Sequence, residues 1–338
     1  MSAINIKHLA ELLKLSPSTV SRALNDSFEI SDGTKKRVKA LAKELGYQPN
    51  PYARSLRGQK STTIAVIIPE RVNNFFGQVI EGIEDVTQPH GYHLLVYNSQ
   101  EDVEVEKTIV SNLINGRVDA IVMSVTNQTS NFDHLNRIHA SGVPLVFFDR
   151  VCAEIPTTKF ITNDYESAYL GTKQLIESGC SKIVFLVLSK EVSTGKERLR
   201  GYLDALKDGG LTFEENWILT CSEKEDENIE RISEVLAEGY SGLGILASIE
   251  KLAVSTYYAV RKVGIKMPDQ VKVISFSNMK FPEILDPPLS IISQPAYEIG
   301  SSCAKILMDH LLSDKPQTLE DKTVTLPSKL SIRKSSGN

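Results

Sequence analysis

Residues 5–25 read NIKHLAELLKLSPSTVSRALN, and this stretch decides the fold of the amino-terminal part of the chain. Asn5 is a good helix N-cap, and the apolar residues after it recur at the spacing of one helix face: Ile6, Leu9, Ala10 and Leu13. After a short turn, Ser16 provides a second N-cap, and Pro17 suits the first helical position because its missing N–H costs nothing there. We therefore predict two short helices joined by a tight turn.

A third helix is predicted after Ser31, and it ends at Gly46, a favoured residue just beyond a helix. Its inward side chains are Val38, Leu41, Ala42 and Leu45, whereas the second helix leaves polar side chains outside: Ser18, Thr19, Ser21, Arg22 and Asn25. Such a helix-turn-helix lets small hydroxyls approach base edges and an arginine bind guanine O6 and N7. The pattern alone leaves open a three-helix bundle with a solvated polar face.

Charge is distributed unevenly along the chain. Residues 1–60 hold eleven basic and five acidic residues, so the head carries +6 and the remainder carries −10 of the net −4. A basic head on an acidic body indicates a local contact with a polyanion. No run of about 18 apolar residues is present, and residues 1–15 lack the pattern of a secretory signal, so we expect a cytoplasmic protein without a membrane span.

The head stretch and residues 31–61, SDGTKKRVKALAKELGYQPNPYARSLRGQKS, closely resemble the amino terminus of the lactose-repressor (LacI/GalR) family. The resemblance extends over essentially the whole chain, although Lys14 stands where the family often has glycine in a left-handed turn. It implies base reading by Pro17, Ser18 and Arg22, and phosphate contacts by Thr19, Ser21, Asn25, Thr34 and Tyr47. Phosphate contacts set the register, and base contacts give the sequence preference.

Residues 49–60 form a proline-started linker that is too short to make a stable helix without partners. The resemblance implies a hinge helix that orders on DNA, with Asn50 and Ala53 among the DNA-binding residues. Leu56 is implied to be a wedge that enters the minor groove and bends the duplex, and an exposed linker residue is the alternative.

From residue 61 onward, apolar strand patterns alternate with helical patterns. A first series comprises TIAVIIP, HLLVYNS, AIVMSV and PLVFFD, and a second comprises KIVFLVL, WILTCS, GLGILAS and VKVISFS. This alternation is typical of parallel sheets covered by helices on both faces. We predict an α/β protein with a three-helix DNA-binding head (1–48), a hinge (49–60) and a two-lobed, periplasmic-binding-protein-like domain with two parallel sheets (61–338).

The chain is expected to cross between the lobes near residues 162, 291 and 321. The N-lobe would then hold residues 61–162 and 292–321, and the C-lobe residues 163–291 and 322–338. Residues 322–336, KTVTLPSKLSIRKSS, are predicted to be a strand that returns to the C-lobe. No leucine heptads follow, so the tetramerising tail of the family is absent and we expect a homodimer.

Ligands of open α/β sheets bind beyond the carboxyl ends of the strands, and the residues there are polar and aromatic. The candidate effector-binding residues are Phe75, Phe76, Ser124, Asp149, Arg150, Arg198, Ser277, Asn278 and Gln294. By the resemblance, Arg198 matches the arginine of the family motif R-x-x-G-[YFW]. The alternatives are an interlobe ion pair for Asp149 with Arg150, and core packing for the two phenylalanines.

Two departures from the family pattern bear on the effector. Ile249-Glu250 stands where the family usually has Asn-Asp, and Ser277 replaces its sugar-binding carboxylate. Serine cannot act as an anionic acceptor, so an effector that carries an acidic group is one hypothesis. The six histidines and four cysteines are scattered, and no nucleotide-binding glycine motif is present, so we expect no metal, no cofactor and no enzyme activity.

The sequence therefore predicts a DNA-binding transcriptional regulator, a repressor, that binds palindromic operator DNA and a sugar-like effector. Three alternatives are kept. A solute-binding transport protein would need a secretory signal and would lack the basic head. An enzyme on a doubly wound fold would show turnover, and a regulator without an effector is compatible with the altered positions Ile249 and Ser277.

Overall fold

The computed structural model describes residues 5–47, 60–314 and 318–337. The chain divides into two compact units, Met1–Ser61 and Thr62–Asn338, which we call the head and the body. Within the described residues, no helix is long and apolar enough to cross a membrane.

The head consists of α1 (Ile6–Leu13), α2 (Pro17–Leu24) and α3 (Asp32–Glu44). The predicted caps are confirmed, because Asn5 accepts a hydrogen bond from His8 N (3.0 Å) and Ser16 accepts one from Thr19 N (3.1 Å). Lys14 has the left-handed conformation (φ 54°) that was expected to favour glycine. The small core of the head consists of Leu9, Ala10, Val20, Ala23, Val38 and Ala42.

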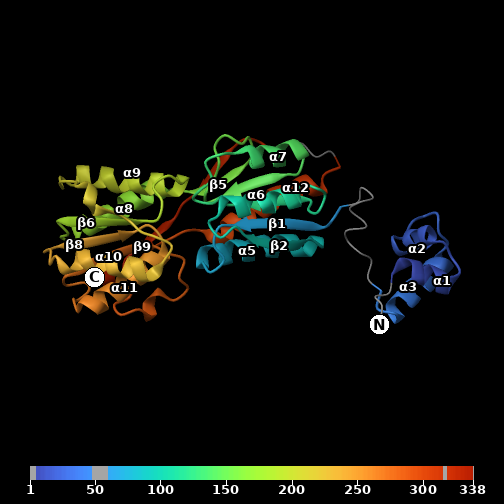
Figure 1. Ribbon diagram of the computed structural model, residues 1–338, viewed down its shortest axis with the longest axis horizontal. Helices are drawn as coiled ribbons and strands as arrows, with labels where there is room; N and C mark the ends of the chain where they lie inside the picture. The colour runs from blue at the N-terminus through green and yellow to red at the C-terminus, as the bar shows by residue number, and fades with distance from the viewer. Residues whose placement is uncertain (1–4, 48–59, 315–317, 338) are drawn as a thin grey trace. The chain divides into compact units, whose positions relative to one another are not determined.

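The first sheet of the body has the strand order β11-β5-β4-β3-β1-β2, and all of its neighbouring strands are parallel. Its strands are β1 (Thr63–Ile68), β2 (His93–Asn98), β3 (Ala120–Met123), β4 (Leu145–Phe148), β5 (Lys159–Thr162) and β11 (Thr323–Leu326). Its helices are α5 (Asn74–Thr87), α6 (Val103–Leu113), α7 (Asp133–Ser141) and α12 (Ala296–Leu312), with the 3-10 turn η1 (Gln88–His90). We call this part the N-lobe (Figure 1).

The second sheet has the order β12-β10-β9-β8-β6-β7, and only β12 with β10 is antiparallel among these pairs. Its strands are β6 (Lys182–Val187), β7 (Ile218–Thr220), β8 (Leu243–Ala247), β9 (Val271–Phe276), β10 (Ser290–Ser293) and β12 (Lys329–Ser331). Its helices are α8 (Asp164–Glu177), α9 (Ser193–Asp208), α10 (Glu225–Ala237) and α11 (Glu250–Val263), with η2 (Glu215–Trp217), η3 (Pro282–Ile284) and η4 (Lys334–Ser336). We call this part the C-lobe.

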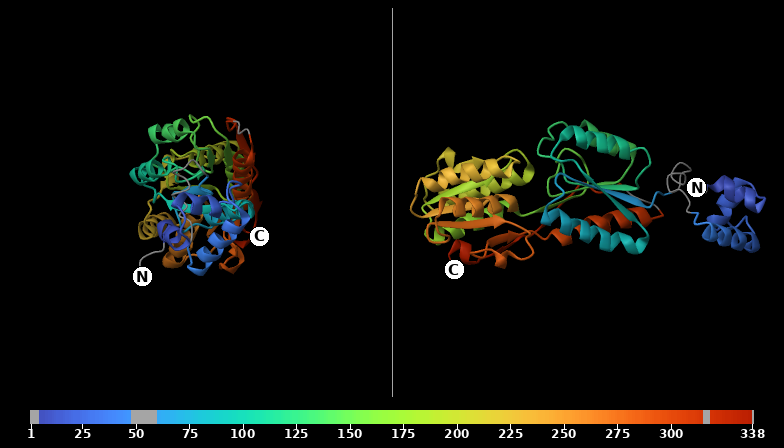
Figure 2. Two further views of the ribbon diagram at one scale, coloured as in Figure 1. Left: turned by 90° about the vertical axis from the view of Figure 1, so that its right-hand side faces the viewer. Right: turned by 60° about the horizontal axis from the view of Figure 1, so that its bottom comes forward.

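The central strands β1, β3, β4, β6, β8 and β9 are covered on both faces, which explains why they are nearly continuous apolar runs. In the N-lobe, Ile64 and Val66 of β1 pack toward α5 and α12, whereas Ala65 and Ile67 pack toward α6 and α7. In the C-lobe, Ile183 and Phe185 of β6 pack toward α8 and α9, whereas Val184 and Leu186 pack toward α10 and α11. Figure 2 shows these layers from two further sides, and the predicted fold class is confirmed.

The crossings between the lobes differ in detail from the predicted positions. The first follows Thr162, but the second follows Ser293, because β10 pairs with β9 through Ile292 and with β12 through Ser293. The third lies between Leu326 and Lys329 rather than near residue 321. Residues 322–336 are therefore not one C-lobe strand. They form β11, which pairs with β5 in the N-lobe, and then β12, which pairs with β10 in the C-lobe.

Strand β5 was not predicted from the sequence. It has only four residues and begins with Lys159, a residue type that rarely lies in a buried strand. The lysine is only 4% exposed, and its Nζ donates to Thr157 O (3.0 Å) and to Asp321 Oδ1 (2.8 Å). These partners compensate the charge, so the strand can be buried although its pattern is polar.

Candidate functional site

Helix α2 presents the polar side chains that were predicted to face DNA. Pro17, Ser18, Arg22 and Asn25 are exposed, and Thr19 and Ser21 are half-buried. Ser16 Oγ lies 2.8 Å from both the Ser18 and the Thr19 hydroxyl oxygens, and the Asn25 amide donates to Ser21 O (3.0 Å). The helix start is thus organised before any ligand binds.

Two predicted phosphate-contact residues lie outside α2. The Thr34 hydroxyl lies 3.0 Å from Ser31 Oγ at the start of α3, and Tyr47 is half-buried against the head core. The hinge residues Asn50, Ala53 and Leu56 lie outside the described residues.

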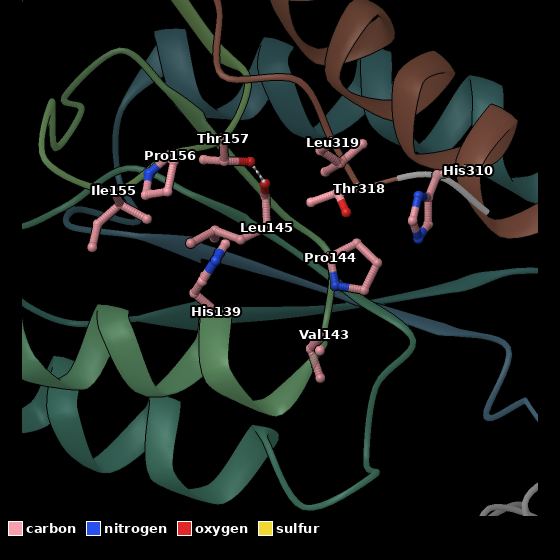
Figure 3. A pocket seen from close by; sticks show the side chains of 11 residues that line it. His139, Val143, Pro144, Leu145, Ile155, Pro156, Thr157, His310, Thr318 and Leu319 are labelled. Atoms are coloured by element: carbon pink, nitrogen blue, oxygen red, sulfur yellow. Dashed lines mark hydrogen bonds between the residues drawn. The ribbon is translucent and has the colours of Figure 1, made fainter.

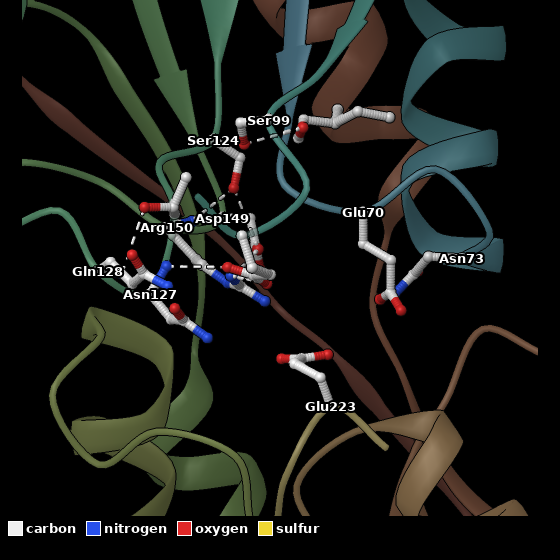
Figure 4. Close-up of polar contacts among 12 residues, drawn as sticks. Glu70, Asn73, Ser99, Ser124, Asn127, Gln128, Asp149, Arg150 and Glu223 are labelled. Atoms are coloured by element: carbon white, nitrogen blue, oxygen red, sulfur yellow. Dashed lines mark hydrogen bonds and ion pairs between the residues drawn. The ribbon is translucent and has the colours of Figure 1, made fainter. Parts of the chain in front are cut away.

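A narrow cleft between the two lobes collects most of the predicted effector residues. Its walls come from the start of α5 and the end of β4 on the N-lobe, and from α9, the start of α11 and the end of β9 on the C-lobe. It is lined by Asn73, Phe75, Phe76, Asp149, Arg150, Thr194, Arg198, Ile249, Glu250, Phe276, Ser277, Asn278 and Gln294. The cavity measures about 50 Å³. Figure 4 shows its N-lobe wall.

Asp149 is the buried carboxylate at the carboxyl end of β4. Its φ of 59° is left-handed, which turns the chain sharply into the cleft. Ser124 lies behind it, and the Ser124 hydroxyl donates to Asp149 Oδ2 at 3.4 Å. Burial raises the pKa of Asp149 to about 6, although the nearby Arg150 and Arg198 act in the opposite direction.

Arg150 is fixed by a carboxylate that was not predicted. Its Nη1 donates to Glu101 Oε1 (2.6 Å), whereas its Nε lies 3.9 Å from Asp149 Oδ2. Glu101 also accepts from Asn127 N (2.9 Å). The closest carboxylate of Arg150 is therefore Glu101, and the alternative Asp149–Arg150 pair is a longer contact that lies within the N-lobe and not between the lobes.

Arg198 is almost completely buried. Its Nε donates to Asp164 Oδ1 (2.6 Å), its Nη1 donates to Ser248 O (2.5 Å), and its guanidinium lies 3.9 Å from the centre of the Phe276 ring. Burial raises the pKa of Asp164 above its usual range, although Arg198 lowers it. All three of these partners belong to the C-lobe, so the C-lobe alone holds the Arg198 side chain in the cleft wall.

Ser277 stands where the family usually has a carboxylate, but the carboxylate of Glu250 lies beside it. Glu250 is thus an acidic group of this part of the cleft. Its Oε2 accepts from the Ser277 hydroxyl (2.7 Å) and from Asn278 N (3.1 Å). The Asn278 amide donates to Gln294 O (2.8 Å), and the Gln294 amide donates to Thr162 Oγ1 (3.3 Å). The sequence signal for Glu250 was its position at the start of a helix, three residues after the buried strand β8 ends.

Several polar contacts connect the lobes across this cleft. Glu250 Oε1 accepts from the Asn74 amide (2.6 Å), and the Gln78 amide donates to Asn278 O (3.0 Å). Lys251 Nζ lies 3.3 Å from Glu70 Oε1. We call these three contacts the α5 bridge, because the N-lobe partners lie on or just before α5.

Phe75 and Phe76 serve two purposes. Their rings meet edge to face with centroids 5.3 Å apart, and Phe76 meets Phe148 in the same way at 6.0 Å. Both belong to the N-lobe core and both line the cleft. Core packing and a contact with the effector are therefore compatible roles for Phe75 and Phe76.

A second cavity, of about 440 Å³, lies in the N-lobe near the amino ends of β4 and β5. It is lined mainly by apolar residues and by two histidines, His139 and His310 (Figure 3). It is larger than the cleft, but it lies at the strand ends where α/β sheets do not usually bind ligands. Within the described residues, no cluster of His, Cys, Asp and Glu could hold a metal ion.

Comparisons with known proteins agree with both parts of this architecture. Residues 5–50 match the model of bacterial regulatory proteins of the lacI family, and residues 61–332 match that of periplasmic binding proteins and the sugar-binding domain of the LacI family. The protein belongs to the LacI family. It is a DNA-binding transcriptional regulator with a small-molecule effector domain, and the resemblance found in the sequence is confirmed.

Individual relatives span nearly the whole chain. Catabolite control protein A of Priestia megaterium is 29% identical over 98% of this chain and 99% of its own. A lac repressor dimer bound to operator and the anti-inducer ONPF is 22% identical, covers 99% of both chains and has a TM-score of 0.79. The regulator CelR in complex with cellobiose is 22% identical, covers 98% of this chain and 99% of its own, and has a TM-score of 0.72. The LacI family consists of transcriptional regulators, not enzymes.

Proposed function

We propose that this protein is a homodimeric, cytoplasmic repressor that binds palindromic operator DNA through α2 and is controlled by a neutral, hydroxyl-rich molecule in the interlobe cleft. The observation that carries the effector part is that two carboxylates, Asp149 and Glu250, line one cleft together with the rings of Phe75 and Phe76. Carboxylates accept hydrogen bonds from hydroxyls, and ring faces pack against the apolar side of a sugar.

The charges in the cleft favour a neutral ligand over an acidic one. Each arginine already has a close carboxylate partner, Glu101 for Arg150 and Asp164 for Arg198. Asp149 and Glu250 then remain as further acidic groups of the wall. An anionic ligand would have to displace an existing ion pair and pay its desolvation cost. This argues against the hypothesis of an acidic effector that the loss of a carboxylate at Ser277 had raised.

Effector binding requires the lobes to move apart. The cavity of about 50 Å³ is far below the roughly 300–1,000 Å³ of ordinary small-molecule sites. The α5 bridge holds the narrow form, so a ligand that fits only a wider cleft shifts the body toward an open form. Such a shift requires different affinities for the two forms.

In the DNA-binding part of the proposal, two heads of a dimer read inverted half-sites about one helical turn apart. Arg22 reads a base, and Ser18 and Pro17 touch base edges beside it. Thr19, Ser21, Asn25, Thr34 and Tyr47 contact phosphates. The dimeric lac repressor bound to operator, which shares the fold, supports this arrangement.

Selection of bound sequences from a random duplex pool tests the DNA part. A near-palindromic site supports the proposal, and no enrichment at low salt contradicts it. Thermal shift and calorimetry of the full chain test the effector part, with neutral disaccharides, amino sugars and sugar acids as probes. Binding of sugar acids alone would contradict the neutral-ligand assignment, and no binding of any class would favour a regulator without an effector.

A further inference from the structure

The loop between α2 and α3 follows a specific hydrogen-bond pattern. Asp26 N donates to Ala23 O (3.3 Å) and Ser27 N donates to Arg22 O (3.0 Å), while Asp26 has a left-handed φ of 55°. These two bonds and this conformation form a Schellman motif, which ends a helix and fixes the direction of the chain after it. The loop therefore leaves α2 in a defined direction.

The next residues return the chain toward α2. Ile30 N donates to Ser27 O (3.2 Å), Glu29 N donates to Ser27 Oγ (3.4 Å), and Ile30 packs against the head core. Glu29 Oε2 then lies 2.9 Å from Arg22 Nη1. Side chains of Arg22 and Glu29 are 59% and 49% exposed, so both remain accessible to DNA.

This contact leaves most of the Arg22 guanidinium available. A guanidinium has five N–H donors in a rigid plane, and guanine recognition needs two of them. Within the described residues, Glu29 is the only carboxylate that pairs with Arg22. A carboxylate on one edge of the plane restricts its rotation while the remaining donors stay free for a base.

Glu29 also carries a negative charge at the predicted DNA surface. By charge alone it weakens binding to every duplex equally, because phosphates repel it. If Glu29 instead holds Arg22 in place, the loss of Glu29 changes discrimination only at the base pair that Arg22 reads. Sequence discrimination and overall affinity therefore separate the two effects.

We infer that Glu29 is a positioning residue for Arg22: it orients the guanidinium for one base pair and raises sequence discrimination there, while it lowers affinity for DNA in general. This inference rests on the proposed function, in which Arg22 reads a base. Glu29 is then a specificity-determining residue that lies outside α2, in the loop between α2 and α3.

The test uses the full chain and the duplex that the wild-type protein selects from a random pool. Dissociation constants are measured for that duplex, for single base-pair replacements in it, and for an unrelated duplex. The variants are Glu29→Ala, Glu29→Gln and Arg22→Ala, and the matched control is Asp26→Asn. Asp26 lies in the same loop and carries the same charge, but it pairs with Lys39 at 2.6 Å.

At the base pair where Arg22→Ala loses its preference, Glu29→Ala should lose about two- to fivefold in discrimination, as expected for one exposed ion pair. Glu29→Gln keeps an acceptor oxygen and should lose less. Asp26→Asn should keep full discrimination, and it should strengthen binding to the unrelated duplex about as much as Glu29→Gln does. In an Arg22→Ala background, Glu29→Ala should have no further effect on discrimination.

Unchanged discrimination in Glu29→Ala, or a loss that persists in the Arg22→Ala background, overturns the inference and leaves the proposed function intact. If Arg22→Ala relaxes no base pair, base reading by Arg22 and the inference fall together. Equal unfolding midpoints for all variants confirm that the comparison is made between folded heads.

Discussion

Two arginine–carboxylate pairs, one in each unit, illustrate how the same chemistry serves different purposes. Arg22 and Glu29 in the head are both about half exposed, whereas Arg198 and Asp164 in the C-lobe are each 5% exposed. An exposed pair contributes little to folding and can change partners. A buried pair cannot lose one member without leaving an uncompensated charge. The head pair is therefore available for DNA, and the C-lobe pair fixes the wall of the cleft.

The largest effect should come from breaking the buried pair. Asp164→Ala removes the carboxylate that binds the buried Arg198 guanidinium at 2.6 Å and leaves its contacts with Ser248 O and the Phe276 ring; it should cost about 3–5 kcal/mol in free energy of unfolding. Urea unfolding followed by fluorescence of Trp217, the single tryptophan, measures it. The control is Glu197→Ala, which breaks the exposed Arg200–Glu197 pair on the same helix. Equal losses of unfolding free energy in Asp164→Ala and Glu197→Ala would show that the buried pair contributes no more to stability than an exposed pair.

A second effect concerns the pH dependence of stability. Because the pKa of Asp149 is raised to about 6 in the folded chain, the folded state binds this proton more tightly than the unfolded state. Stability should therefore fall as pH rises from about 4 to about 6 and stay level above that range. Asp149→Asn should reduce this slope, although Asp164, whose pKa is also raised, still contributes to it, and should gain on the order of 2 kcal/mol over wild type at pH 7. Urea unfolding at several pH values measures it. The exposed Asp269→Asn is the control, and a slope in Asp149→Asn as steep as in wild type would contradict the assignment.

The exposed arginine should affect recognition and not folding. Arg22→Ala should cost about 1–3 kcal/mol in binding to the selected duplex and relax one base pair, with no change in unfolding. Titrations against the selected duplex and its single replacements measure both quantities. Arg37→Ala, an exposed arginine on α3, is the control that removes the same charge. The base-reading role would be wrong if both variants lost affinity evenly over all sequences.

The smallest effect should come from the α5 bridge. Asn74→Ala removes the partner of Glu250 across the cleft and should shift the body toward an open form by less than about 1 kcal/mol. Small-angle scattering, or energy transfer between dyes on the two lobes, measures the mean separation. Glu81→Ala, an exposed position on the same helix, should leave it unchanged. A separation that does not differ between these variants would exclude the bridge as a factor in closure.

Much of the head could be predicted from sequence because its signals are local. The caps Asn5 and Ser16 and the left-handed Lys14 depend only on neighbouring residues. Strand β5 and the true path of residues 322–336 depend on pairing with distant strands, which composition does not reveal. A four-residue strand that starts with a buried lysine has no local pattern to distinguish it.

The site residues show the same division. The positions that follow strands, such as Asp149 and Ser277, could be selected because carboxyl ends of parallel strands meet at one edge of a sheet. The carboxylates that bind Arg150, Arg198 and Ser277 could not be selected, since Glu101, Asp164 and Glu250 reach them from other loops and helices. The contacts of those partners decide the charge balance of the cleft, and that balance changed the expected class of effector.

The order of strands has a consequence for synthesis of the chain. The small core of the head is complete once Tyr47 has left the ribosome, because all of its members lie before that residue. The N-lobe core needs α12, and its sheet needs the edge strand β11, so it cannot close until residue 326 has emerged. A chain that ends before residue 326 thus carries a complete head core joined to an unfinished body.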